Sequence, residues 1–342
     1  MTIQRMRSRR GLTAIGTLTL VASVFMATTL AGASTSTPSI SQGKISHSHA
    51  ASLPSIWYIN PLTAYPLFND AAAAFKASAA KLGFKATVVG SSTINIPQQI
   101  TLIDQAITSG ANAVIFCDLD PATYAKTIKA AEAKGVVMIT TSCVDTISNY
   151  SVGTDNVAFG QSAAKAVAKS AGSRANVVAF GVSMTVPNQA ASYNAFVAYA
   201  KKHYPGMSVT FVADGGSPST TATQLESLGQ AYPKANAIWF IEGGDVSVIP
   251  SSLQHAHIKK GHYFVLAIDA LPTTIAAIKS GWVTESLAQC YFWATPFTAK
   301  LALLKLAGHG PKQQSWNIPV QVVGKKQLPY KGCPSSYFPA VK

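Results

Sequence analysis

Short apolar runs alternate with longer helix-like stretches along this chain, and this alternation restricts the fold more than any other feature. In the first half we expect strands at residues 54–59, 84–89, 113–117 and 136–141, with helices at 69–82, 97–108 and 121–134. Continuous apolar strands between helices of this length are typical of βαβ units, whose parallel sheet is buried on both faces. The sequence therefore predicts an α/β fold with a doubly wound parallel sheet.

The same alternation starts again after residue 155. We expect helices at residues 159–171, 189–203, 221–232, 248–254, 273–280 and 294–307, and strands at 176–180, 209–212, 237–241, 263–268, 283–287 and 317–323. Two such units in one chain predict two Rossmann-like domains of similar build. Ligands of open parallel sheets bind beyond the carboxyl ends of the strands, so two facing edges would form a cleft that hinge closure can shut.

The N-terminus has the order of segments that is typical of a secretory signal peptide. A basic start at Arg5–Arg10 precedes an uncharged, largely apolar run to about Leu30, and Ala31-Gly32-Ala33 is a small-x-small cleavage pattern. We expect residues 1–33 to be removed, although a membrane anchor is the alternative reading. The partial twin-arginine pattern at Ser8–Leu12 leaves the export route open.

The residues after the predicted cleavage site bear on localisation. Position 34 is Ser, so we expect a protein of the periplasm or cell surface that is not lipid-anchored through an N-terminal Cys. Residues 34–53 are rich in Ser, Thr and His and are predicted to be a flexible leader. The formal charge of +14 would fall to about +10 when the four arginines of the signal peptide leave. The lysines do not form a stripe, so a nucleic-acid partner is not expected.

Six short motifs give the chain a resemblance to a known family. They are Tyr65-Pro66-Leu67-Phe68, Cys117-Asp118-Leu119-Asp120, Thr154-Asp155-Asn156, Tyr204-Pro205-Gly206, Ala267-Ile268-Asp269-Ala270 and Leu287-Ala288-Gln289. In this order and spacing they resemble the type 1 periplasmic binding proteins of ABC importers, especially the ribose/galactose-like branch. The resemblance runs from about residue 56 to about residue 326.

The resemblance implies discontinuous domains and a transport role. The N-terminal lobe would comprise residues 54–154 and 290–314, the C-terminal lobe 156–288 and 316–326, and the tail 327–342. Three chain crossings would form the hinge, with Asp155 and Asn156 organising the first. The implied function is to capture a small-molecule solute as a monomer, without a cofactor or metal, and to deliver it to an ABC permease.

The same resemblance supplies the candidate ligand-binding residues. They are Tyr65, Phe68, Asp120, Ser142, Asn188, Gln189, Glu242, Asp269 and Gln289. Carboxylates and amides suit sugar hydroxyls, and flat aromatic rings suit the apolar faces of a sugar. Alternatives stay open at three positions, because Phe68 could be core packing, Asp120 a helix N-cap and Gln289 a bridge in the hinge.

Several positions depart from the family pattern. Ser142-Cys143 stands where the family often has Asp-Arg, the stretch from Asn188 to Asn194 has no arginine, and an Asn-Asp turn is replaced by Glu242-Gly243-Gly244-Asp245. Losing arginine removes rigid bidentate donors while the acids remain. We therefore expect an amino sugar, a polyol or an amine-bearing metabolite rather than an ordinary pentose or hexose.

The four cysteines allow two disulfides after export. Cys117 and Cys143 end two core strands that the fold predicts to be neighbours, so they are either bridged or two buried thiols. A Cys290–Cys333 bridge would fasten the tail to the hinge region. No CxxC or His/Cys ligand spacing indicates zinc.

Other function classes find little support in the sequence. No nucleophile elbow, phosphate loop or metal-binding helix indicates an enzyme. A transcriptional regulator of the same fold would need an N-terminal helix-turn-helix, and a signal peptide stands there. Delivery of the ligand to a chemoreceptor or sensor kinase stays open, as does a nucleoside or autoinducer-like ligand.

Overall fold

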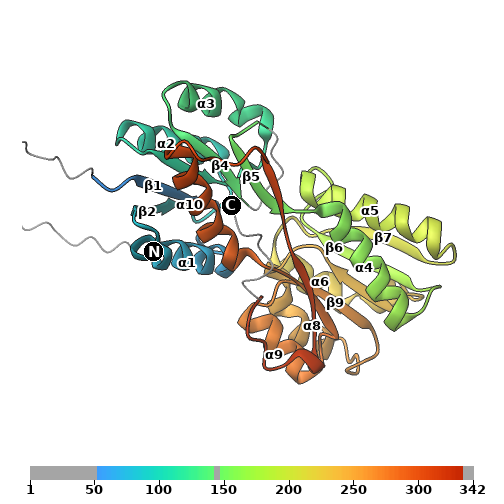
Figure 1. Ribbon diagram of the computed structural model, residues 1–342. Coiled ribbons are helices and arrows are strands. Elements are labelled where there is room, and N and C mark those ends of the chain that lie inside the picture. The colour runs from blue at the N-terminus through green and yellow to red at the C-terminus, as the bar shows by residue number, and fades with distance from the viewer. Residues whose placement is uncertain (1–51, 142–146, 334–342) are drawn as a thin grey trace, which may run out of the picture. The chain divides into compact units, whose positions relative to one another are not determined.

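The computed structural model describes residues 52–141 and 147–333 (Figure 1). The predicted signal peptide, nearly all of the leader, Ser142, Cys143 and most of the tail lie outside these residues. No helix among the described residues is long and apolar enough to cross a membrane. The described part of the chain contains two sheets of six strands each, so the prediction of two α/β domains is confirmed.

The first sheet is wholly parallel and has the strand order β11-β5-β4-β3-β1-β2. Its strands are β1 (Ser55–Asn60), β2 (Lys85–Gly90), β3 (Ala113–Phe116), β4 (Val137–Thr141), β5 (Tyr150–Thr154) and β11 (Ser315–Ile318). The helices α1 (Pro66–Leu82) and α10 (Tyr291–Leu306) pack on one face. The helices α2 (Ile96–Thr108) and α3 (Pro121–Ala133) pack on the other, as Figure 1 shows.

The second sheet has the order β12-β10-β9-β8-β6-β7. Its strands are β6 (Asn176–Gly181), β7 (Ser208–Ala213), β8 (Ala237–Phe240), β9 (Phe264–Ile268), β10 (Glu285–Gln289) and β12 (Val320–Gly324). One face packs against α4 (Asn156–Ala171) and α5 (Pro187–His203). The other packs against α6 (Pro218–Glu226), α7 (Leu228–Ala231), the 3-10 helix η1 (Gly244–Val248), α8 (Ile249–His255) and α9 (Pro272–Ser280), and η2 (Lys325–Gln327) follows β12.

The sheet interiors follow from the strand sequences. The four residues of β3 are Ala-Val-Ile-Phe and all are buried, which a strand covered by helices on both faces requires. Alternate residues of β1 point to different cores: Ile56 and Tyr58 lie with α1 and α10, whereas Trp57 and Ile59 lie with α2 and α3. The strands that alternate with helices along the sequence thus form one sheet with a layer of helices on each face.

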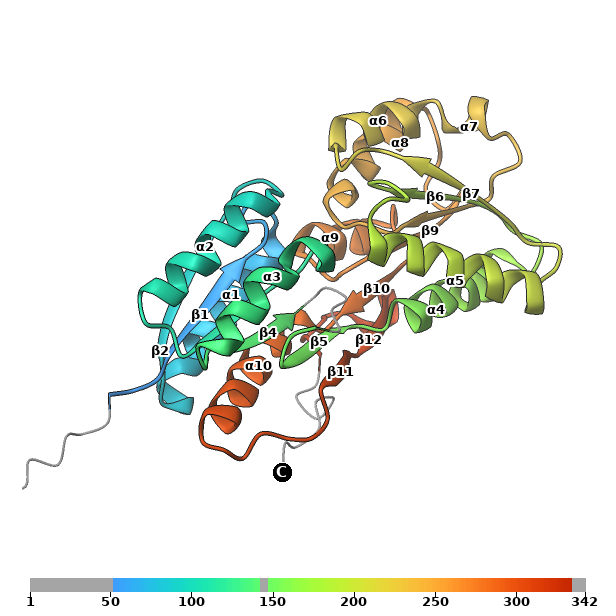
Figure 2. The ribbon, with the colours of Figure 1, turned by 90° about the horizontal axis from the view of Figure 1, so that it is seen from above.

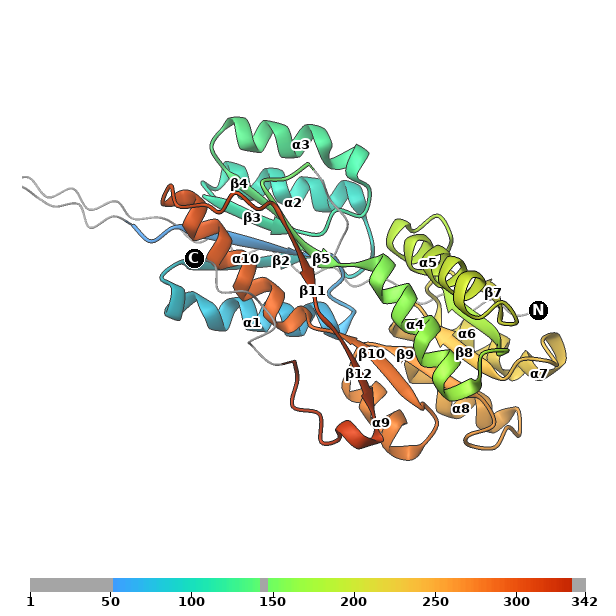
Figure 3. The ribbon, with the colours of Figure 1, turned by 45° about the vertical axis from the view of Figure 1, so that its right-hand side comes forward.

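The chain passes between the two sheets three times, after β5, after β10 and after β11. Figures 2 and 3 show β11 and β12 as consecutive arrows of one extended ribbon that serves both sheets. The second and third passages are hydrogen-bonded to each other. The backbone amide of Cys290, in the second passage, donates to the carbonyl of Pro319, in the third, at 3.2 Å. The predicted lobe boundaries stay a prediction, except that β11 pairs with β5 in the first sheet, whereas the prediction assigned residues 316–326 to the C-terminal lobe.

Three expectations about elements were wrong. A single strand at 317–323 is instead two strands in different sheets, separated at Pro319, which has no N–H to donate to a ladder. The second sheet is not wholly parallel, because β12 runs antiparallel to β10. The expected helix at 221–232 breaks into α6 and α7 at Ser227.

The disulfide predicted between Cys290 and Cys333 is present, with Cα atoms 5.7 Å apart. The indole Nε1 of Trp293 donates to the Cys333 carbonyl at 2.7 Å, which also holds this part of the tail. Cys117 is disulfide-bonded as well. Its predicted partner, Cys143, lies outside the described residues, so that pairing stays a prediction.

Candidate functional site

The candidate site is centred on Asp269, the residue that directly follows β9. Its backbone φ is 61°, a left-handed conformation that non-glycine residues seldom adopt and that is found mainly at constrained or functional positions. The backbone is held by β10, because its amide donates to the Leu287 carbonyl at 3.0 Å and its carbonyl accepts from the Ser286 hydroxyl. This fixes a buried carboxylate at the carboxyl end of the second sheet.

Two predicted site residues bind the Asp269 carboxylate. The Tyr65 hydroxyl, from the loop after β1, donates to Oδ2 at 2.7 Å, and the Gln289 amide donates to Oδ1 at 3.1 Å. Gln289 accepts in turn from the Thr154 hydroxyl at the end of β5, and that hydroxyl lies 3.2 Å from the Tyr291 hydroxyl. This chain of hydrogen bonds joins residues at the ends of strands in both sheets.

Asp269 lies close enough to Glu242 to influence the ionisation of that carboxyl. Burial raises the pKa of Glu242 to about 7, and the charges of Asp214 and Asp269 add to that effect, while hydrogen bonds from the amides of Gly244 and Asp245 lower it. Burial raises the pKa of Asp269 to about 6, partly offset by the hydrogen bonds from Tyr65 and Gln289. Both groups are therefore partly protonated near neutral pH.

Gly243 allows Tyr65 to approach these acids. A Cβ atom at position 243 would lie 1.9 Å from the Tyr65 hydroxyl and 3.1 Å from Asp269 Oδ2. Burial and the nearby charges of Asp269 and Glu242 raise the pKa of the Tyr65 phenol well above its ordinary value, so this group remains a proton donor. Here a glycine is required by a close approach rather than by a turn.

Aromatic rings from the first lobe line the same region. Phe68, which is half-buried, contacts Tyr65 edge-on with ring centroids 5.6 Å apart and Tyr291 with centroids 6.4 Å apart. Phe68 is thus part of an aromatic cluster beside the Tyr65–Asp269 hydrogen bond. Whether it contacts a ligand remains a prediction.

Other predicted residues have structural partners instead. Asp120 stands at the N-cap position of α3, and its carboxylate accepts from the Thr123 hydroxyl at 2.5 Å. Gln189 is buried, and its Oε1 accepts from the amide of Val182 at 2.8 Å. The side-chain oxygen of Asn188 accepts from the Gln189 amide at 3.0 Å. These three side chains are thus held by partners of their own, and Ser142 lies outside the described residues.

The predicted hinge residues lie at the first passage between the sheets. Asp155 accepts from the amide of Ala158 at 2.9 Å, which caps α4, and its other oxygen accepts from the Asn317 amide of β11 at 3.2 Å. The Ser192 hydroxyl donates to Asn156 at 3.5 Å. Asp155 therefore connects the first passage to the strand that precedes the third.

Two acids at the site were not predicted as site residues. Asp214 follows β7 and Asp245 lies in η1, and both are buried. Burial and the charges of Glu242 and Asp214 raise the pKa of Asp245 to about 8. The sequence signal was present, since Asp214-Gly215-Gly216 follows a strand and Asp245 ends the Glu242 turn, but nothing in it showed that the two turns meet.

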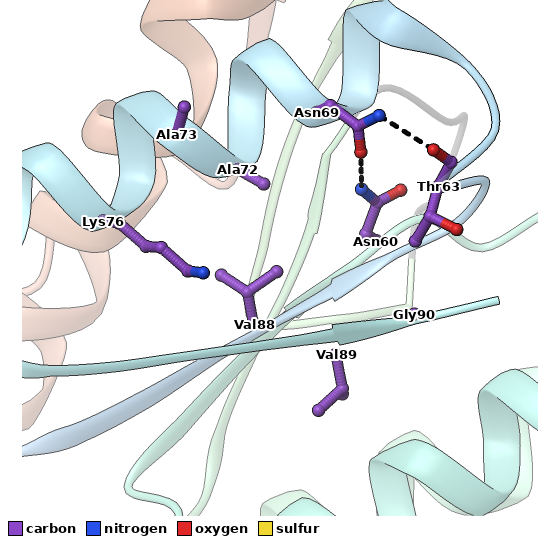
Figure 4. A pocket seen from close by; sticks show the side chains of 9 residues that line it. All are labelled: Asn60, Thr63, Asn69, Ala72, Ala73, Lys76, Val88, Val89 and Gly90. Carbon is purple, nitrogen blue, oxygen red and sulfur yellow. Dashed lines mark hydrogen bonds between the residues drawn. The ribbon is translucent and has the colours of Figure 1, made fainter. Parts of the chain in front are cut away.

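A separate pocket of about 330 Å³ lies between α1 and the edge strand β2 (Figure 4). The amide of Asn60 donates to Asn69 at 3.1 Å, and the amide of Asn69 donates to the Thr63 carbonyl at 2.8 Å. Lys76 extends along the pocket wall toward Val88. Because its amides bond mainly to the protein itself, this pocket is a weaker candidate than the group around Asp269.

Known structures share the fold. An ABC-transporter solute-binding protein from Burkholderia graminis C4D1M, in complex with D-arabinose, matches with a TM-score of 0.76 and 19% identity, covering 82% of this chain and 98% of that chain. GanP, a glucose-galactose binding protein from Geobacillus stearothermophilus, matches with a TM-score of 0.74 and 19% identity over 81% and 99% of the two chains. XylFII in the XylFII-LytSN complex matches with a TM-score of 0.73 and 22% identity over 81% and 99%.

The sequence itself identifies the family. A comparison with curated protein sequences gives no match. Residues 56–309 match the family described as "Periplasmic binding protein domain", which is a family of binding proteins. The resemblance inferred from the six motifs is confirmed. The chain belongs to the periplasmic binding protein domain family.

Proposed function

We propose that this protein is the extracytoplasmic solute-binding component of an ABC importer. It binds a small polar ligand, of the sugar, amino sugar or polyol kind, beyond the carboxyl ends of the two sheets, and closes on it by motion about the three chain passages. The closed form then delivers the ligand to a permease in the membrane. A D-arabinose complex and a glucose-galactose binding protein among the structures of the same fold support this class of ligand.

One observation carries the proposal more than any other. The Tyr65 hydroxyl, from a loop of the first sheet, donates to the Asp269 carboxylate of the second sheet at 2.7 Å. Open parallel sheets bind ligands at these strand ends. An ionised carboxylate accepts about four hydrogen bonds, so a polyhydroxylated ligand can donate to Asp269 beside Tyr65 and Gln289.

A thermal-shift screen of the mature protein tests the proposal. Sugars, amino sugars, polyols, amines and nucleosides are compared, and a ligand at 100 times its Kd should raise the free energy of unfolding by roughly 2.7 kcal/mol. Tyr65→Phe and Gln289→Ala should weaken the binding of any hit. A folded protein that responds to no class of solute would count against a binding function.

Export forms part of the proposal and has a separate test. Expression of the full chain in a secreting host should give a mature protein whose N-terminal residue is Ser34. Retention of residues 1–33 in a membrane fraction would favour the anchor reading.

A second candidate function concerns the partner rather than the ligand. XylFII, which has the same fold, is found in a complex with LytSN. The ligand-bound form of this protein could likewise dock on a chemoreceptor or a sensor kinase. Loss of solute uptake on deletion of the gene supports import, whereas intact uptake with a lost transcriptional or chemotactic response supports sensing.

A further inference from the structure

Four carboxylates gather at the carboxyl end of the second sheet. Asp214 follows β7, Glu242 follows β8, Asp269 follows β9, and Asp245 lies one short turn beyond Glu242. The charges of Asp214 and Asp269 act on Glu242, and those of Glu242 and Asp214 act on Asp245. The four side chains therefore form one electrostatically connected group, which we call the acid group.

Part of the acid group lacks hydrogen-bond partners. Asp245 is 1% exposed, and neither of its carboxylate oxygens makes a well-formed hydrogen bond within the described residues. Asp214 and the Thr221 hydroxyl lie close enough to affect its pKa, but that hydroxyl donates to the Ser217 carbonyl. Asp214 is 2% exposed; its Oδ1 accepts from the Gly216 amide at 2.7 Å, but its Oδ2 has no partner. A buried carboxylate without donors is costly when ionised, so a positive charge brought near it is strongly favoured.

The protein supplies no such charge within its described part. No lysine, arginine or histidine there forms an ion pair with the acid group, and the influences on the pKa values of Glu242, Asp245 and Asp269 include no cation. Arg174 is the only arginine after Arg10, and it packs against Gly206 at the amino end of β6, the opposite edge of the sheet.

We propose that the ligand carries a positively charged ammonium group, which sits against Glu242 and Asp269. This inference rests on the proposed function and narrows its ligand class. Glu242 is partly exposed at the end of β8, and Asp269 offers the carboxylate that Tyr65 and Gln289 hold in place. Asp214 and Asp245 are positioning residues, which act through Glu242 and do not touch the ligand.

Binding of the cation is coupled to release of protons. The groups that face Glu242 are Asp214, Asp245, Asp269 and the neutral phenol of Tyr65. The charges of Asp214 and Asp269 disfavour a negative charge on Glu242, and the charges of Glu242 and Asp214 disfavour one on Asp245. Near pH 6 to 7 the acid group therefore holds protons, and the ammonium group of the ligand displaces them into the buffer. Affinity should rise with pH by up to about tenfold per unit for each proton released.

Matched ligand pairs test the inference with the mature protein. D-glucosamine is compared with N-acetyl-D-glucosamine, D-galactosamine with N-acetyl-D-galactosamine, and putrescine with 1,4-butanediol, by thermal shift at pH 5 and pH 7.5. The expected result is that at least one amine raises Tm at pH 7.5, less so at pH 5, and that its neutral counterpart does not. Titration calorimetry of that amine in buffers of different ionisation heat should show proton release.

Three variants separate the roles of the residues. Glu242→Gln should weaken binding of the amine by about tenfold to a hundredfold, because a charge-assisted contact is lost. Asp214→Asn keeps Oδ1 as an acceptor for Gly216 but lowers the pKa of Glu242, so the rise in affinity should begin at lower pH. Asp104→Asn, at an exposed acid of α2, should change neither.

The outcomes distinguish this inference from the proposed function. Tight, pH-independent binding of a neutral sugar or polyol from the wider screen would overturn the inference that the ligand is a cation, but it would support the proposed solute-binding function. Binding of an amine without proton release, or with full affinity in Glu242→Gln, would also overturn it. Absence of binding by every class of solute would overturn both.

Discussion

Asp269 combines a constrained backbone with a carboxylate that Tyr65 and Gln289 bind. The left-handed φ of 61° turns the chain immediately after β9, and the contacts of its amide and carbonyl with β10 keep it there. A residue in such a conformation persists only where its surroundings determine it. The fixed backbone therefore helps to position the carboxylate for its hydrogen bonds with Tyr65 and Gln289.

At the residue scale, Gly243→Ala should break the Tyr65–Asp269 contact. The new Cβ would lie 1.9 Å from the Tyr65 hydroxyl, so the ring must move away. We expect a loss of about 1–3 kcal/mol in the free energy of unfolding, measured in urea, together with weaker ligand binding. Gly229→Ala is the control, because its Cβ would meet only the Tyr263 hydroxyl at 3.7 Å. Equal behaviour of the two variants would contradict this account.

The candidate site was predictable where it depends on strand ends. Tyr65, Glu242, Asp269 and Gln289 all follow strands that the apolar pattern located, and the structure brings them together. Asp245 was not assigned to the site, because its burial arises from packing between turns that lie apart in sequence. Asp120 was predicted to bind ligand, but its carboxylate accepts a hydrogen bond from Thr123, three residues later. Sequence spacing alone does not tell whether such a carboxylate at a strand end caps a helix or binds a ligand.

At the scale of elements, the apolar runs located most strands, but the first turns of several helices were predicted to begin too late. The helices α1, α5, α6 and α9 begin at Pro66, Pro187, Pro218 and Pro272. Proline is favoured in the first turn, where its missing N–H has no partner to lose. The division between β11 and β12 was missed for another reason. Residues 317–323 form one continuous strand-like run in the sequence, but in the fold β11 pairs with β5 and β12 pairs with β10.

Asp155 allows a prediction about the passages between the sheets. Asp155→Ala removes both the cap of α4 and the contact with Asn317, whereas Asn95→Ala removes only the cap of α2. Each variant should lose about 0.5–2 kcal/mol of stability in urea unfolding. Asp155→Ala alone should also change ligand affinity, measured by calorimetry, if the passages act as a hinge. Unchanged affinity in Asp155→Ala would argue against a hinge role for this residue.

The Cys290–Cys333 disulfide links the second passage to the tail across 43 positions of sequence. Replacing both cysteines with serine should lower the free energy of unfolding by about 2–4 kcal/mol, because the unfolded chain regains the freedom of the open loop. Guanidinium unfolding of the double variant and the parent, both without reductant, measures the difference. An unchanged midpoint would mean that Trp293 and its neighbours hold the tail without the bond.

At the scale of the whole molecule, the acid group makes the stability of the ligand-free protein fall as pH rises. The folded pKa values of Asp269, Glu242 and Asp245 are about 6, 7 and 8, against roughly 4 in an unfolded chain. Between these limits the native state binds more protons than the unfolded state, so the free energy of unfolding decreases with pH. The decrease begins above about pH 4, where unfolded carboxyls ionise, and is complete above about pH 8.

Asp245→Asn tests the source of this slope. The variant carries no ionisable group at position 245, so it should match the parent near pH 4 and exceed it in stability at pH 8, because folding of the parent keeps a proton on Asp245 that the unfolded chain releases. The slope that it removes is on the order of 1.4 kcal/mol per pH unit for one proton. Urea unfolding between pH 4 and 8.5 measures it, with Asp104→Asn as the variant of an exposed acid. A parallel fall in the parent and in Asp245→Asn would place the pH dependence outside Asp245. An amine ligand should reduce the fall in stability of the parent with rising pH, because its positive charge compensates the carboxylates that protons neutralise in the free protein.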